Sequence, residues 1–113
     1  MIEIPIPRPE GAPLPWFDMQ VVLDSVTYTL ELRWNKRAAA WFLTLWDETA
    51  ATRLYASMKA VIAWPLNAYR SGAKLPGMLI LFDTSGQSLA PTLADLGDRV
   101  RLYYITAADL GLG

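Results

Sequence analysis

Two pairs of carboxylates are the side chains in this sequence whose type and spacing first suggest acid–base chemistry. Asp47 is followed directly by Glu48, and Asp95 is followed three positions later by Asp98. A glycosidase needs two carboxyl groups that face each other across a cleft. Both pairs lie in segments rich in turn-forming residues, where aspartate commonly bonds to nearby backbone. We therefore interpret both pairs as turn residues and expect no catalytic residue among them.

Histidine and cysteine are both absent from the chain. A Ser-His-Asp triad, an imidazole metal site, a thiolate nucleophile and a disulfide are therefore excluded. The segment Gly72-Ala73-Lys74 does not match a phosphate-binding loop, because the spacing of that motif is missing. We predict that the protein is not an enzyme and that it uses no cofactor and no metal ion.

The charge balance argues against a nucleic-acid partner. Ten Lys and Arg residues face 11 Asp and Glu residues, for a net charge of −1. A nucleic-acid-binding domain usually shows a clustered basic excess. No apolar run approaches the ~20 residues that span a bilayer, and the first residues do not resemble a secretory signal. We expect no nucleic acid and no membrane as partners, and assembly in a cytoplasm.

Apolar and aromatic residues are in surplus for a chain of this size. The apolar fraction is 53%, and the 113 residues include five tryptophans and five tyrosines. Large aromatic side chains dominate the energetics of both cores and interfaces. A small β domain has difficulty enclosing all of them, so we expect several at contacts with other proteins, first of all Trp46 and Trp64.

The pattern of apolar residues predicts one all-β domain. Residues 16–23, 27–34 and 40–47 read as consecutive strands, and in 27–34 apolar and polar residues alternate strictly. The three strands should form an antiparallel meander. Asp24 and Ser25 between the first two are turn residues.

The second half continues with strands. For residues 47–60 we prefer a strand over a competing helix, and residues 78–83 read as a strand buried on both faces at the centre of the core. Residues 99–105 form a last strand. The predicted fold is a small antiparallel sandwich or partly closed barrel of about six to seven strands.

The first 15 residues read as an extended arm before the domain. They contain five of the eight prolines, and proline fits neither a helix interior nor a central strand. Ile2, Ile4 and Ile6 alternate with other residues, which predicts one apolar side that lies along a neighbouring subunit. We expect an arm over 1–15, a single β domain over 16–106 and a loose tail over 107–113.

The sequence resembles the baseplate plug proteins of contractile-tailed phages over most of its length. The resemblance rests on residues 1–5, on the strand-turn-strand pattern of 30–35 and 41–47, and most specifically on the run Leu96-Gly97-Asp98-Arg99-Val100-Arg101-Leu102-Tyr103-Tyr104 after Pro91-Thr92-Leu93. It implies a structural component of the virion, located at the axis of the tail baseplate. Its implied partners are hub, spike, tube or wedge subunits, with several copies of the chain in each particle.

Two functions remain open at this point. A structural plug or adaptor would copurify with tail particles at a defined copy number. A small-molecule or carbohydrate-binding β module would instead be a soluble monomer with an aromatic-lined pocket.

Overall fold

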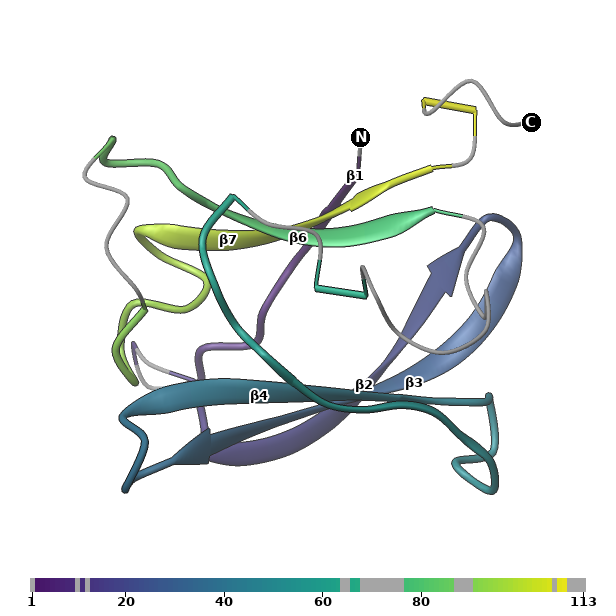
Figure 1. Cartoon of the computed structure of the whole chain (residues 1–113), viewed down its shortest axis with the longest axis horizontal. Coiled ribbons are helices and arrows are strands. Elements are labelled where there is room, and N and C mark those ends of the chain that lie inside the picture. Colours follow the sequence, from purple (N-terminus) through teal and green to yellow (C-terminus); the bar gives the residue numbers. More distant parts are fainter. Residues whose placement is uncertain are drawn as a thin grey trace.

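The chain folds into two antiparallel β-sheets that face each other as two layers (Figure 1). The computed structural model describes residues 2–9, 11, 13–63, 66–67, 77–86, 91–106 and 108–109. Its strands are β1 (Ile2–Ile4), β2 (Trp16–Leu23), β3 (Val26–Asn35), β4 (Ala40–Trp46), β5 (Arg53–Lys59), β6 (Met78–Asp83) and β7 (Val100–Ile105). The predicted all-β class and strand number are confirmed, and of the two predicted architectures the sandwich is correct.

The larger sheet has the strand order β2-β3-β4-β5, which confirms the predicted meander and adds a fourth strand. Asp24 and Ser25 have φ angles of 49° and 67° and join β2 to β3, as expected of a two-residue hairpin turn with both central residues left-handed. The predicted strand within residues 47–60 is confirmed as β5. In the described part of the chain, no helix is long and apolar enough to cross a bilayer.

The smaller sheet has the order β1-β7-β6, so β7 is its central strand. Residues 78–83 were expected as a strand buried on both faces at the centre of the core, and the adjacent residues Leu79, Ile80 and Leu81 are all buried. Leu79 and Leu81 are fully buried, but β6 lies at the sheet's edge, beside an isolated bridge from Ile62 to Leu81. An apolar run shows that a strand is buried without showing which strands flank it.

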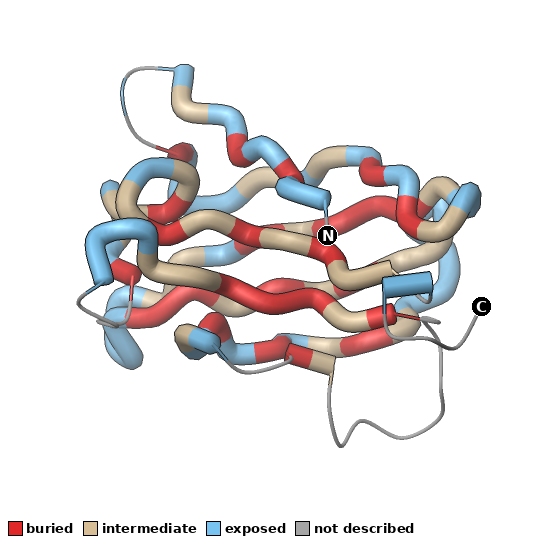
Figure 2. Tube along the Cα trace, turned by 90° about the horizontal axis from the view of Figure 1, so that it is seen from above, coloured by how far each residue is buried: buried red, intermediate tan, exposed pale blue. Residues whose placement is uncertain are grey.

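Residues 2–9 run along the domain rather than away from it. β1 pairs with β7 of the same chain, from Ile2 opposite Tyr104 to Ile4 opposite Leu102. Ile4 and Ile6 belong to the chain's own hydrophobic core. Exposed and buried positions alternate from Glu3 to Pro7 (Figure 2), whereas Ile2 is exposed.

Residues 91–99, here called the closing turn, close one end of the sandwich. The Arg8 guanidinium donates from Nη1 to the carbonyl oxygens of Ala94 and Leu96 at 2.7 and 3.1 Å. The Trp41 indole donates to the Thr92 carbonyl at 3.2 Å. The closing turn is therefore bonded to both the N-terminal segment and the larger sheet.

Gly97 lets the closing turn pack closely against the N-terminal segment. Its φ is +87°, a left-handed conformation that residues with a Cβ adopt only at a cost. A Cβ at this position would lie 2.9 Å from Cβ of Ile6. Both the backbone conformation and the available space therefore require glycine here.

Tyr104 joins the two sheets by a buried polar contact. Its hydroxyl donates to Oδ2 of Asp24 at 2.6 Å and accepts the Gly77 N–H at 2.9 Å. Burial, followed by the bond to Asp24, raises the pKa of the Tyr104 phenol above its ordinary value. The phenol is thus a neutral donor that ties β7 to the β2–β3 turn.

Candidate protein contact surface

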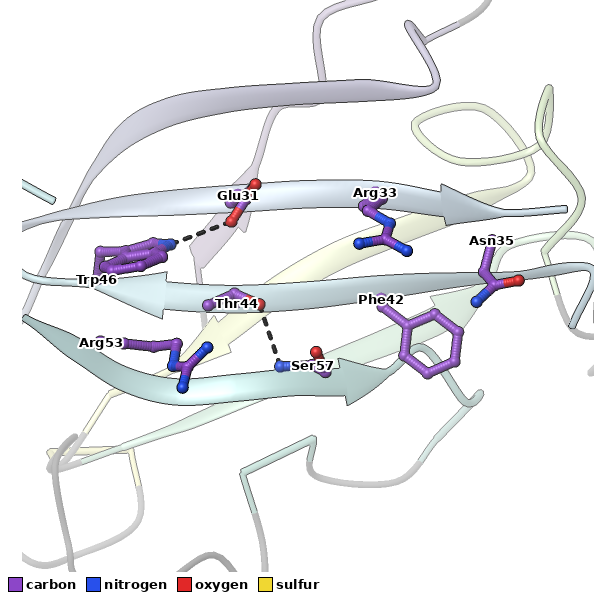
Figure 3. Close-up of a pocket in the computed structure, with 8 residues that line it drawn as sticks. All are labelled: Glu31, Arg33, Asn35, Phe42, Thr44, Trp46, Arg53 and Ser57. Carbon is purple, nitrogen blue, oxygen red and sulfur yellow. Dashed lines mark hydrogen bonds between the residues drawn. The ribbon is translucent and has the colours of Figure 1, made fainter.

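The face of the larger sheet that points away from the core carries polar and aromatic side chains. Because side chains alternate along a strand, the register places Glu31 and Arg33 of β3 on the opposite side from the buried Leu30 and Leu32. A shallow cavity of about 260 Å³ lies on this side (Figure 3). We call this side the outer face; its cavity is lined by Glu31, Arg33, Asn35, Phe42, Thr44, Trp46, Arg53 and Ser57.

A carboxylate held between two tryptophans organises the outer face. The Trp16 indole donates to Oε2 of Glu31 at 2.5 Å, and the Trp46 indole donates to Oε1 at 3.1 Å. The three residues lie on three adjacent strands, and each tryptophan is a diagonal neighbour of Glu31 in the register. Both carboxylate oxygens are therefore occupied within the chain, and the two indoles are held in fixed orientations.

Two arginines on the outer face form no ion pair with any carboxylate among the described residues. The Arg33 guanidinium lies 5.7 Å from the centre of the Trp16 ring, within the range of a cation–π contact. Arg53 stands opposite Trp46 in the register. Among the described residues, neither arginine forms an ion pair. A guanidinium can bind a carboxylate through two parallel hydrogen bonds, so each of the two arginines is suited to bind an acidic group.

A β-bulge shapes the side of the cavity formed by β5. The pairing of β4 with β5 shifts between Leu43 and Leu45, and Ser57 has a φ of 45°. The Ser57 N–H donates to Oγ1 of Thr44 at 3.0 Å, so the hydroxyl replaces a missing ladder bond (Figure 3). Bulges bend a strand and redirect its side chains. Here the bulge places Ser57 against the cavity.

The predicted contact residues fall in different environments. Trp46 lies on the outer face, and Ile2 is exposed. Ile4 and Ile6 are buried within their own chain, at 5% and 9% exposure. Their alternation is therefore explained by intramolecular packing. Trp64 lies outside the described residues.

Trp16, Arg33 and Arg53 of the outer face were not predicted from the sequence as contact residues. Trp16, at 65% exposure, is the most exposed of the large apolar residues that the structure describes, and Arg33 and Arg53 stand on either side of the cavity. The strict alternation in β3 already placed Glu31 and Arg33 away from the core. What it could not show is that Arg53, 20 positions later, is brought to the same face.

The two carboxylate pairs occupy turns, as predicted. Oδ1 of Asp47 accepts the Ala51 N–H at 2.8 Å. Oδ2 of Asp95 accepts the Thr92 N–H and hydroxyl at 3.0 and 2.8 Å and the Arg99 Nη2 at 2.8 Å. These bonds, that of Arg99 first, lower the pKa of Asp95 to about 2. Over the described residues, no cluster of three or more Asp or Glu could hold a metal ion.

Comparison with known proteins gives one informative match. No curated protein matches the chain. The model of the family described as cyanophage baseplate Pam3 plug gp18 matches residues 1–107, which is nearly the whole sequence. The resemblance drawn from the sequence is confirmed, and with it a virion location in the phage tail and a class of partners, the other baseplate components. The chain belongs to this cyanophage baseplate plug family and is a structural protein of the phage tail baseplate.

Proposed function

We propose that the chain is a plug or adaptor at the axis of a contractile tail, acting through protein–protein contacts and without catalysis. Its neighbours there would be hub, spike, tube or wedge subunits. Family membership supports the baseplate role. The contact mechanism rests on Arg33 and Arg53, which form no ion pair in the described structure. On the same face lie the indoles of Trp16 and Trp46, which are held in fixed orientations.

The chemistry of the outer face selects an acidic segment of a partner protein. Tryptophan and arginine are the residues most enriched at interface hot spots. Acidic side chains of the partner would bind Arg33 and Arg53, which the register sets four positions apart along β4, while apolar side chains between them would contact Phe42 and Trp46.

The alternative of a carbohydrate or small-molecule site is less well supported by the same cavity. Small-molecule sites usually have volumes of ~300–1,000 Å³ and bury most of the ligand. The cavity on the outer face measures about 260 Å³ and lies open on a sheet surface. A surface of this shape fits a side chain of a docked protein better than an enclosed sugar.

The test is incorporation of charge-reversed chains into tail particles. The double variant Arg33→Glu, Arg53→Glu should reduce the amount of the chain in purified particles at least about tenfold, the change expected from ~1.4 kcal/mol of lost contact energy. The matched control is Lys36→Glu, Arg37→Glu, which changes the charge equally in the exposed β3–β4 turn. Electron cryomicroscopy of the wild-type particles should place the chain on the tail axis.

Three results would contradict the proposal. Equal loss with both double variants would mean that overall charge, not the outer face, governs incorporation. Full incorporation of the Arg33→Glu, Arg53→Glu variant would remove the two arginines from the contact. Density for the chain at the periphery of the baseplate would exclude an axial plug.

A further inference from the structure

The free edge of the larger sheet is formed by β2, and its backbone orientation can be derived from the register. The Pro15 carbonyl accepts the Trp34 N–H at 2.7 Å, so residue 15 directs its backbone toward β3. In an antiparallel pair this orientation alternates. The backbone N–H and C=O groups of Trp16, Asp18, Gln20 and Val22 therefore point away from β3. None of the described residues pairs with them.

The other sheet edges carry features that prevent strand addition, and β2 does not. β5 has the bulge at Ser57 and ends at Lys59. β6 is covered by backbone bonds of 2.7 Å each from Ala63 and Leu66. β1 is only three residues long and is followed by Pro5. β2 is eight residues long and contains no proline, no lysine and no register shift. Long edges of this kind pair with other strands unless they are protected.

Apolar side chains along β2 are also left uncovered. Trp16 and Val22 are 65% and 63% exposed. They point to the outer side near opposite ends of the strand. A cavity of about 230 Å³ between β1 and β2 is lined by Ile2, Met19 and Val21, among others. The strand therefore offers hydrogen bonds at its edge, exposed apolar side chains on its outer side and a cavity on its other side.

The sequence of β2 is complementary to itself in one antiparallel register. When Met19 lies opposite Met19 of a second copy, Trp16 lies opposite Val22 and Asp18 lies opposite Gln20. The residues whose backbones point outward then meet each other, which permits about eight inter-chain hydrogen bonds from four pairs. We infer that two copies of this chain associate through their β2 strands around a two-fold axis at Met19, forming one continuous sheet of eight strands.

Neighbouring registers are less favourable. A shift that places Asp18 opposite Asp18 brings two like charges together, and like charges directly opposite each other destabilise a strand pair. A shift in the other direction places Val22 opposite Asp18 and leaves Trp16 without a partner. The register centred on Met19 alone covers the two exposed apolar residues and separates the two carboxylates. It also sets Phe17 and Met19 of the second copy beside the cavity that Ile2 lines.

Sedimentation of the purified full-length chain tests the association. The wild type should form a species of twice 12.6 kDa. Val22→Lys should raise the dimer dissociation constant at least about tenfold, because a lysine on the edge replaces an apolar contact. Val26→Lys is the matched control: Val26 is also exposed, at 50%, but lies on β3, so its dissociation constant should not change.

Single introduced cysteines test the register, because the chain contains no cysteine of its own that could form a competing disulfide. Paired residues at the proposed axis have Cα atoms ~4.5 Å apart, within the range that a disulfide spans. The Met19→Cys variant should therefore form a cross-linked dimer under oxidation, and Gln20→Cys should not. Gln20→Lys should tighten the dimer and Gln20→Asp should weaken it, since residue 20 faces Asp18 of the second copy.

Several results would overturn the inference. One is a wild type that stays monomeric at all concentrations, including a monomer that pairs β2 only with a different baseplate protein. Another is a dimer that Val22→Lys and Val26→Lys weaken equally. Preferential cross-linking of Gln20→Cys would exclude the register. These measurements use the isolated chain, so they are independent of incorporation into particles.

Discussion

The closing turn and the outer face both contain charged and aromatic residues. Two charged groups of the closing turn bond to each other within the chain, whereas two arginines of the outer face do not form ion pairs among the described residues. In the closing turn, Asp95 and Arg99 bond to each other, and Arg8 bonds to the turn's carbonyl groups. On the outer face, Arg33 and Arg53 have no ion-pair partner among the described residues.

This contrast separates the residues that identify the family from the residues that are available to contact partners. The chain most specifically resembles plug proteins in the run from Pro91 to Tyr104. The contacts described for this run are made within the domain. The residues of the outer face belong to segments with an ordinary strand pattern. A family can therefore be recognised by the residues that build its fold, while the residues that contact partners must be found from the structure.

The largest effect on stability should come from filling the closing turn. Gly97→Ala should lower the free energy of unfolding by about 3 kcal/mol, because ~1–2 kcal/mol arises from the left-handed backbone and ~1–3 kcal/mol from overpacking. The new Cβ would lie 2.9 Å from Cβ of Ile6 and 3.2 Å from Cδ of Arg8. Urea unfolding of the purified chain measures the change.

Gly86→Ala separates the two causes. Gly86 has a similar φ of +79°, but a Cβ there would have no atom within 4 Å. It should therefore lose only the conformational part, about 1 kcal/mol. Equal losses at the two glycines would show that the closing turn is not closely packed against the N-terminal segment.

A smaller effect should appear in acid at Asp95. Its pKa in the folded chain is about 2, below the ordinary value of 3.8, so the folded state binds this proton less readily than the unfolded state. Its stabilising contribution is then fully present above pH 4 and is lost as the pH falls toward 2. Between pH 4 and pH 2 the urea midpoint of the wild type should fall more than that of Asp95→Asn.

Asp98→Asn is the matched control for this titration. Asp98 lies three residues away on the same turn, and its exposed carboxylate accepts no hydrogen bond from the described residues. This variant should lose stability in acid as steeply as the wild type. An Asp95→Asn variant with the full acid sensitivity of the wild type would show that the bonds to Arg99 and Thr92 do not hold the closing turn.

Local patterns in the sequence were sufficient for much of the fold. Alternation in residues 27–34 gave the inner and outer sides of β3, and Asp24-Ser25 gave the hairpin turn. Both depend on residues close together in the chain, where spacing and geometry are directly related. The same reasoning gave an extended N-terminal segment with one apolar side, although it was expected as an arm outside the domain.

Such local patterns did not show which strands pair with each other or which distant residues share a face. The isoleucine alternation is the same whether the segment pairs with β7 of its own chain or with a neighbour, so Ile4 gave no sign of which sheet it joins. The outer face depends on the register that pairs Arg53 with Trp46 of β4 and on a bulge at Ser57. A single Cα register shift moves every side chain to the other side of a strand, and composition does not encode it.

The smallest effect on stability should come from the outer face itself. Glu31→Gln keeps the size of the side chain but replaces one of the two oxygens that accept indole N–H groups. The free energy of unfolding should change by less than about 1 kcal/mol, because the released indole can bond to water instead. Tryptophan emission should shift to longer wavelength as that indole becomes hydrated. A loss of stability as large as that of Gly97→Ala would mean that the outer face stabilises the fold as much as the closing turn does. A small loss of stability together with the emission shift would show that the polar groups of the outer face are arranged for a partner rather than for the stability of the chain.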